Sequence, residues 1–212
     1  EKFRNFTESV IHTYFHCNNH PKEINKFKIF LPHELLIYMN LYEKTLSEEI
    51  VYTGDYLTFT KVKVQLPDGN EANRDIIKHP GACGIIPFVD ENHIILIRQF
   101  RKSIDKVIYE IPAGKLSSDE SPENCAYREL EEETGYQASS LFHLGTVAIV
   151  PGYCDELLYI YNATNLSLSK KHEDFDEFTE VEIFTLEEVK NMIKSGEIID
   201  AKTITALAYT MI

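Results

Sequence analysis

The stretch that decides the fold reads GKLSSDESPENCAYRELEEETGY and occupies residues 114–136. Ser121 has a side chain that is preferred at a helix N-cap, and Pro122 suits the first helical position because no backbone N–H is needed there. Gly135 can adopt the left-handed conformation that ends many helices. The stretch therefore predicts a helix over Pro122–Thr134, preceded by a loop.

Three glutamates of this helix, Glu129, Glu132 and Glu133, share an arc of roughly 100° when each residue advances by about 100°, whereas Glu131 points elsewhere. Like charges on one face repel each other unless cations neutralise them. Clustered carboxylates are hard oxygen ligands that suit Mg²⁺ or Mn²⁺. The residue types alone leave two interpretations open, a metal site and a solvated acidic helix.

The spacing resembles the Nudix box, G-x5-E-x7-R-E-U-x-E-E-x-G-U, in which U is an apolar residue. Every fixed position is filled, by Gly114, Glu120, Arg128, Glu129, Leu130, Glu132, Glu133 and Gly135. The resemblance implies the α/β Nudix fold, an α/β/α sandwich around a mixed sheet. It also implies a metal-dependent hydrolase whose substrates are nucleoside diphosphates linked to another group.

The same resemblance implies roles for the residues of the box. The catalytic metal, Mg²⁺ or Mn²⁺, is expected to be bound by Glu129, Glu132, Glu133 and the backbone carbonyl of Ala113. Arg128 is expected to orient one of these glutamates, and Glu120 to support the site. No glutamate of the box is replaced, so a protein that only binds its ligand is not favoured.

Residues outside the box resemble the ADP-ribose pyrophosphatase branch of this family. They comprise residues 98–101 (RQFR), 110–114 (EIPAG), 196–198 (GEI) and 200–203 (DAKT), and Pro151, which lies sixteen residues after Gly135. The resemblance implies hydrolysis of ADP-ribose to AMP and ribose 5-phosphate. Two alternatives stay open: a hydrolase for another nucleoside diphosphate-sugar, and a non-catalytic protein that senses ADP-ribose.

In this branch the general base lies on a loop after the box, for which residues 170–177 are the candidate segment. We expect Glu173 to be the base, with Asp174 and Asp176 as rivals, and Glu177 to contact the metal. The guanidinium of Arg101 is the first candidate for binding a substrate phosphate. The secondary candidates are Arg98 and Arg74.

The chain before the box divides into two parts. Residues 1–38 contain five basic and four acidic residues with seven aromatic residues and no clear period, so we expect an extension outside the main fold. Residues 39–78 form an N-terminal β subdomain, with strands expected at Ile50–Thr53, Leu57–Leu66 and Arg74–His79, and the turn signal at residues 67–70 predicts a β-hairpin. The hairpin face that carries Val62, Val64 and Leu66 is expected to need a second subunit to cover it. The resemblance implies that this antiparallel subdomain forms a homodimer by exchanging strands, and residues 79–212 form the Nudix domain. A later strand is expected at Leu144–Val150.

An aromatic residue near the sheet could stack on adenine: Tyr56, Phe59 or Phe88.

The composition sets the remaining limits. A net charge of −13 over 212 residues disfavours binding of nucleic acid through a basic face. No apolar run approaches the ~20 residues needed to span a bilayer, so no membrane partner is expected. The four cysteines are scattered, which suits free thiols and a cytoplasmic location.

Overall fold

The computed structural model describes residues 41–170 and 178–210. Three of its strands form an N-terminal antiparallel sheet: β1 (Lys44–Thr53), β2 (Thr58–Gln65) and β3 (Glu71–Lys78). The remaining strands are β4 (Ala82–Pro87), β5 (His93–Arg101), β6 (Lys106–Glu110), β7 (Ala113–Lys115), β8 (Tyr136–Ala148), β9 (Leu157–Leu168) and β10 (Thr179–Thr185). The helices within these ranges are α2 (Pro122–Thr134), α3 (Leu186–Ser195) and α4 (Ala201–Tyr209).

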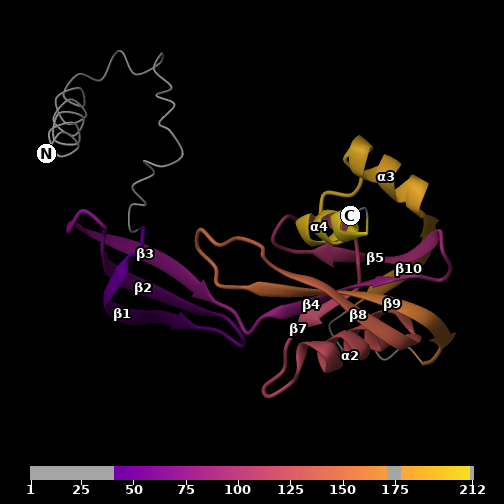
Figure 1. The fold of residues 1–212 in the computed structure, drawn as a ribbon, viewed down its shortest axis with the longest axis horizontal. Helices are drawn as coiled ribbons and strands as arrows, with labels where there is room; N and C mark the ends of the chain where they lie inside the picture. Colours follow the sequence, from indigo (N-terminus) through magenta and orange to yellow (C-terminus); the bar gives the residue numbers. More distant parts are fainter. Residues whose placement is uncertain (1–40, 171–177, 211–212) are drawn as a thin grey trace, which may run out of the picture. The chain divides into compact units, whose positions relative to one another are not determined.

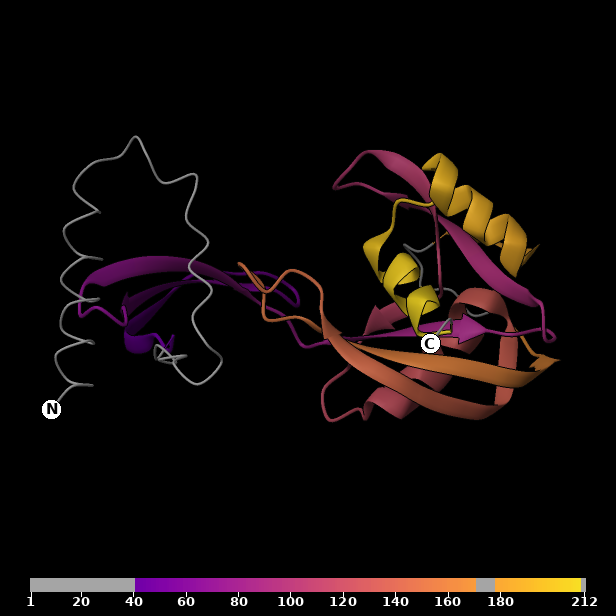
Figure 2. The same cartoon turned by 45° about the horizontal axis from the view of Figure 1, so that its top comes forward.

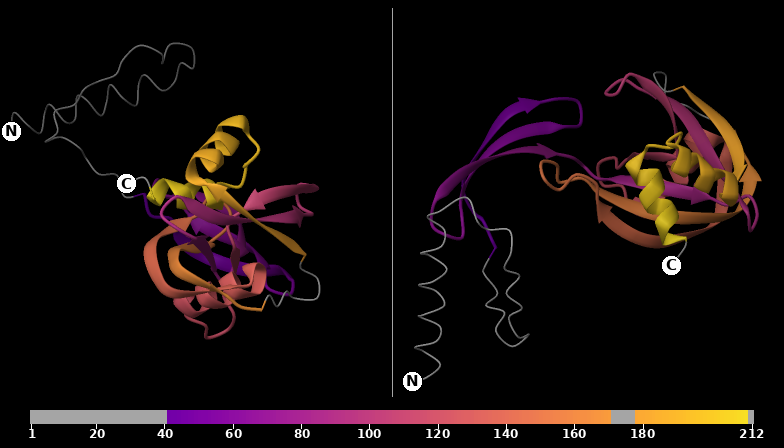
Figure 3. Two further views of the ribbon diagram at one scale, coloured as in Figure 1. Left: turned by 90° about the vertical axis from the view of Figure 1, so that its right-hand side faces the viewer. Right: turned by 90° about the horizontal axis from the view of Figure 1, so that it is seen from above.

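The expected α/β/α sandwich is confirmed. A mixed sheet has the order β7-β4-β9-β8, in which β4 and β9 are parallel and the other pairs are antiparallel. An antiparallel sheet of order β10-β5-β6 completes the central layer. Helix α2 covers one side, and α3 and α4 lie on the other (Figures 1 and 3). The long strands β8 and β9 run beside each other as a curved ribbon (Figure 2).

Strand β4 shows why the centre of the sheet is apolar throughout. Successive side chains of a strand point to opposite faces. Cys83 and Ile85 pack in the cluster beneath α2, whereas Ala82 and Ile86 pack in the cluster that includes residues of α3 and α4. Helices therefore cover both faces of β4, and a polar side chain on either face would be buried away from water.

The predicted bounds of α2 are confirmed, together with both of its caps. The Ser121 hydroxyl accepts a hydrogen bond from the Asn124 N–H, and Gly135 adopts φ 73° with its N–H donating to the Glu131 carbonyl. A non-glycine residue rarely adopts this left-handed conformation. The two caps fix where the helix begins and ends, and so fix which of its residues face the sheet.

The predicted hairpin is also confirmed, since β2 and β3 pair and the Gly69 N–H donates to the Leu66 carbonyl. From the sequence, Val62 and Val64 are expected to stay exposed unless a second subunit covers them. They are only 4% and 5% exposed in the single chain. Arg74, the cross-strand neighbour of Val62, donates hydrogen bonds to Glu43. The apolar side chains that remain exposed lie on β1 instead.

Two strands are longer than the sequence indicated. The apolar run suggested a start at Ile50 for β1 and at Leu144 for a later strand, but β1 begins at Lys44 and β8 at Tyr136. The added segment of β1 is mostly polar and exposed, and the added segment of β8 mixes polar with apolar residues. Backbone pairing with β2 and β9 forms these segments, so the side-chain pattern carries little signal for them.

Within residues 41–170 and 178–210, no helix combines the length and the apolar character that a membrane crossing needs. Three of the four cysteines lie in these ranges, and Cys83, Cys125 and Cys154 are buried free thiols.

Candidate active site

Helix α2 holds the three glutamates where its acidic side meets strand β7. Cys125, Ala126 and Leu130 are fully buried and pack the helix against the mixed sheet. Glu129 and Glu133 are buried as well, although they carry charge. Burying a carboxylate is costly unless charges or hydrogen bonds compensate it. The helix therefore places its acidic residues at a built site and not on a solvated face.

Gly114 makes room for Glu129. A Cβ atom added at this position would lie 2.0 Å from both the Cδ and the Oε1 atom of Glu129. Atoms that are not bonded cannot approach so closely, so only glycine allows the carboxylate to rest against the backbone of β7. The first glycine of the box thus has a steric role that depends on a residue of the helix.

The adjacent residue holds the last glutamate of the group. The backbone N–H of Ala113 donates to Oε2 of Glu133 over 2.8 Å. Glu133 is 3% exposed, and its fixed oxygen leaves the carboxylate in one orientation. Strand β7 therefore positions two of the three glutamates, through the space at Gly114 and the amide of Ala113.

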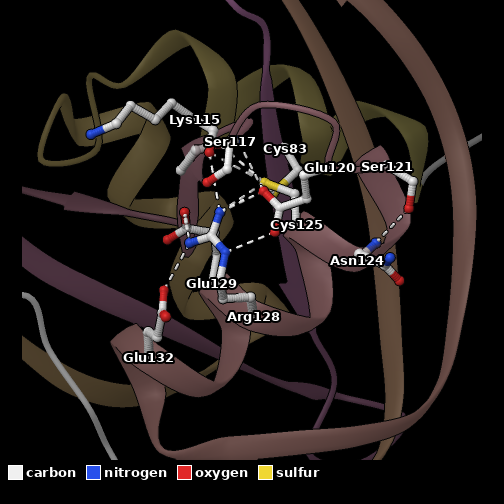
Figure 4. A network of polar contacts seen from close by, with 11 residues as sticks. Cys83, Lys115, Ser117, Glu120, Ser121, Asn124, Cys125, Arg128, Glu129 and Glu132 are labelled. Carbon is white, nitrogen blue, oxygen red and sulfur yellow. Dashed lines mark hydrogen bonds and ion pairs between the residues drawn. The ribbon is translucent and has the colours of Figure 1, made fainter. Parts of the chain in front are cut away.

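Arg128 links the glutamates to one another (Figure 4). Its Nε and Nη2 atoms each donate over 2.8 Å to Glu120. Its Nη1 atom donates to Glu129 over 2.6 Å and to Glu132 over 2.8 Å. Hydrogen bonding to Glu120 raises the pKa of Arg128, so this cation stays charged. Arg128 therefore forms hydrogen bonds with two of the three glutamates as well as with Glu120.

Glu120 stabilises this network in a pH-dependent way. The hydrogen bonds from Arg128 lower the pKa of Glu120 from 4.5 to about 2. A carboxyl whose pKa is lowered in the folded state contributes stability above its unfolded pKa. That contribution is lost as the pH falls from about 4.5 toward 2.

We expect Glu120→Gln to lower Tm at pH 7 by about 3 °C or more, because the charged partner of Arg128 is removed. The deficit should shrink as the pH falls below 4.5, because Glu120 takes up a proton in the unfolded wild-type chain there while the folded carboxylate, with its pKa of about 2, stays charged. Thermal unfolding between pH 7 and pH 3 measures this, with Glu123→Gln as the control at an exposed position of the same helix. A deficit that stays constant over this range would contradict the assigned role.

A second network of charged side chains, centred on Glu110, lies at the ends of β5, β6 and α4. Glu110 is fully buried and accepts hydrogen bonds from Arg101, Nε to Oε1 over 2.6 Å and Nη2 to Oε2 over 2.9 Å. The ammonium of Lys202 contacts the same carboxylate and lies 3.0 Å from Oδ2 of Asp200. Burial alone would raise the pKa of Glu110, but its hydrogen bonds with Arg101 and the charge of Lys202 lower it.

Residues of the Arg128 network and of the Glu110 network line the same cavity, which has a volume of about 570 Å³. Its acidic side includes Glu129 and Glu132, and Arg101 and Lys202 also line it. Tyr56 lies at the same cavity and makes an edge contact with His79, their ring centroids 5.7 Å apart. Phe59 and Phe88, the other two candidates for stacking on adenine, are not among its lining residues.

The predicted residues are only partly brought together. The cavity is lined by Arg101, Ala113, Arg128, Glu129 and Glu132, and Glu133 is attached to Ala113 beside it. Arg98 instead pairs with Glu180 over 2.7 Å, and Arg74 pairs with Glu43. Neither of these arginines lines the cavity. Glu173 and Glu177 lie outside the described residues.

Several cavity residues were not predicted from the sequence, among them Lys115, Glu156, Asp200 and Lys202. The stretch 200–203 did show a branch resemblance, but nothing local to it indicated a cavity. Lys202 reaches the site through Glu110, which is 92 residues away in the chain. Only the tertiary fold brings these two together.

The donor atoms at the cavity fit a hard divalent cation. Glu129 and Glu132 supply carboxylate oxygens at its wall, and Ala113 lies beside them. Among the described residues, no three side chains of histidine, cysteine, aspartate or glutamate already form a closed cage. Mg²⁺ needs no such cage, since it keeps several of its waters and takes one or two carboxylates together with substrate phosphates.

Comparison with known proteins finds a matching family model and several similar sequences. A family model described as "NUDIX domain" matches residues 78–207. An ADP-ribose pyrophosphatase of Bacillus subtilis is 42% identical over 172 residues, which cover 80% of this chain and 93% of that protein. A methanol dehydrogenase activator of Bacillus methanolicus is 40% identical, with 79% of this chain and 91% of that protein covered.

A solved structure shares the fold. The crystal structure of an ADP compounds hydrolase superposes with a TM-score of 0.71 at 22% identity. The match covers 80% of this chain and 92% of the other chain. It includes far more than the box helix, so the arrangement of strands and helices is common to both proteins.

Proposed function

Because the chain belongs to the NUDIX family of hydrolases, we propose that it cleaves the pyrophosphate bond of ADP-ribose. The products are AMP and ribose 5-phosphate, and the cofactor is Mg²⁺ or Mn²⁺. The observation that carries the proposal is that Glu129 and Glu132 line a cavity, with Glu133 bound to the N–H of Ala113, which also lines it. The relative from Bacillus subtilis, described as an ADP-ribose pyrophosphatase, supports the choice of substrate.

Each part of the site has a task in this proposal. Glu129, Glu132, Glu133 and the Ala113 carbonyl would hold a divalent cation, which would supply activation of water and stabilisation of charge on a phosphoryl group. Arg128 keeps Glu129 and Glu132 in a fixed orientation through its two short hydrogen bonds. The proposed base remains Glu173, with Asp174 and Asp176 as rivals, and Glu177 remains a proposed metal contact.

Arg101 is the proposed phosphate ligand. Its guanidinium lines the cavity that Glu129 and Glu132 also line. An arginine binds phosphate oxygens through directed, charge-assisted hydrogen bonds. Arg98 and Arg74 stay weaker proposals for this role, because each is paired with a glutamate away from the cavity.

A panel of substrates tests the proposal. ADP-ribose, GDP-mannose, NADH and diadenosine polyphosphates are each offered to the full-length protein with Mg²⁺. We expect the highest kcat/KM for ADP-ribose. A higher value for GDP-mannose would support the alternative of another nucleoside diphosphate-sugar. Tight binding of ADP-ribose without any cleavage would support a sensing protein.

We also propose a homodimer formed through the N-terminal sheet, in an enzyme of the cytoplasm. The support for the dimer is the surface of β1, where Ile50, Val51 and Tyr52 are each more than half exposed. Three neighbouring apolar side chains on one strand are a costly surface to leave in water. A two-fold interface would cover the same patch on both subunits.

Ile50→Glu is expected to convert the dimer to monomers at micromolar concentration, because it places a charge within the proposed interface. Sedimentation equilibrium measures the change. The control is Val107→Glu, at an exposed position of β6 outside the N-terminal sheet. A wild-type protein that sediments as a fully active monomer would contradict the dimer. Val64→Glu is a poor test, since Val64 is buried within the single chain.

A further inference from the structure

Glu110 is a buried charge that the roles assigned so far do not use. Its side chain is 1% exposed at the end of β6, and two cations contact it. Arg101 comes from β5 and Lys202 from the first turn of α4. A carboxylate in such a place persists when its partners compensate the loss of water. The question is whether these partners also do something at the cavity.

Contacts of Asp200 and Thr203 fix the first turn of α4, which carries Lys202. The Asp200 carboxylate caps α4 by accepting from the Thr203 N–H over 3.0 Å. The Thr203 hydroxyl oxygen accepts from the Ile111 N–H over 2.8 Å, which attaches the helix beside Glu110. Asp200 also pairs with Lys202 itself. The ammonium group therefore has little freedom, although it is carried on a long side chain.

Arg101 is fixed in a comparable way. Glu110 contacts the edge of the guanidinium formed by Nε and Nη2, so the Nη1 group is not used in this pair. Arg101 remains 38% exposed and lines the cavity, as Lys202 does. Two cations from distant parts of the chain thus stand at the cavity that Glu129 and Glu132 also line.

We propose that Glu110 is a positioning residue that holds Arg101 and Lys202 together as a paired cationic site for the diphosphate of the substrate. The inference rests on the proposed function and deepens it, because it adds Lys202 as a phosphate ligand. A fixed cation loses little conformational freedom when an anion binds. Arginine supplies directed hydrogen bonds and lysine supplies a compact point charge.

A structural explanation competes with this one, in which the network only attaches α4 to the sheet. The two explanations differ in what Lys202→Met changes. If the network only attaches the helix, the variant loses stability and its KM for ADP-ribose stays the same. If Lys202 binds phosphate, KM rises in a protein that is still folded.

The test measures KM and kcat for ADP-ribose with Mg²⁺, and Kd for an analogue in which a methylene group bridges the two phosphorus atoms. For Lys202→Met we expect KM and Kd to rise about tenfold or more, with kcat changed by less than about threefold. Lys202→Arg should recover part of the loss. The control is Glu180→Gln, which breaks the surface ion pair of Arg98 on the same strand.

Glu110→Gln tests the positioning role itself. We expect it to raise KM and Kd, and we expect the double variant with Lys202→Met to be less impaired than the product of the two single effects. Independent effects that multiply would overturn the positioning role. If Glu110→Gln does not fold, Lys202→Met decides the inference, and an unchanged Kd in that folded variant overturns it.

The outcome also separates this inference from the proposed function. A wild-type protein that cleaves ADP-ribose, together with an unchanged Kd in Lys202→Met, overturns the paired site alone. A wild-type protein that binds the analogue but cleaves no ADP-ribose contradicts the proposed function, and the Kd comparison still decides the paired site. A wild-type protein that neither binds the analogue nor cleaves ADP-ribose overturns both.

Discussion

Glu133→Gln is expected to lower kcat for ADP-ribose by about 10²-fold or more, in line with the several kcal/mol that a catalytic metal contributes. The glutamine keeps the shape of the side chain and can still accept the hydrogen bond from the Ala113 N–H. It removes the negative charge that the proposed metal site needs. Steady-state kinetics at saturating Mg²⁺ measure the loss.

The matched control lies on the same helix. Glu131 accepts from Gln137 over 2.7 Å and from the Ser169 hydroxyl, and it does not line the cavity. Glu131→Gln removes one charge from α2 and should leave kcat within about twofold of wild type. Equal losses in the two variants would mean that the overall charge of the helix matters and that Glu133 has no special role.

Gly114→Ala is the second substitution for which we expect a large effect, a fall in kcat/KM on the order of 10²-fold. The new methyl group would stand 2.0 Å from the Glu129 carboxylate and must displace it. A displacement of about 1 Å in a catalytic group is enough for such a loss. The far-UV circular dichroism spectrum should stay unchanged, because the backbone of Gly114 does not require a positive φ.

Gly152→Ala is the control for this substitution. A Cβ atom at Gly152 would meet nothing within 4 Å, so the same added methyl group should be tolerated there. Kinetics and thermal unfolding of both variants separate a local displacement from a general loss of stability. Wild-type kcat/KM in Gly114→Ala would show that the position of Glu129 is not critical.

The sequence predicted the box helix well because its signals are local. Ser121, Pro122 and Gly135 set the bounds of α2, and the spacing of the glutamates places them on one side. The prediction for β8 was less successful, since its first half mixes polar residues such as Gln137 and Ser139 with apolar ones and its pairing with β9 forms it. Local signals therefore placed the acidic wall of the cavity and missed part of the sheet beside it.

The cationic wall could be predicted only in part, for a different physical reason. The sequence indicated Arg101 as a phosphate ligand because of its residue type and its place in the stretch RQFR. The same reasoning also indicated Arg98 and Arg74. What separates them is their partners: Arg101 pairs with Glu110 at the cavity, and the others pair with Glu180 and Glu43. Such partners are distant in the chain, and no spacing rule in the sequence connects them.

The most direct measurement is the metal-dependent appearance of products from ADP-ribose. The full-length protein is freed of metal with EDTA and passed into metal-free buffer, and AMP and ribose 5-phosphate are then quantified with and without added Mg²⁺. The proposed mechanism predicts no turnover without metal and, once Mg²⁺ is restored, equal amounts of the two products. Turnover that survives removal of the metal, or cleavage at a bond outside the pyrophosphate, would contradict it.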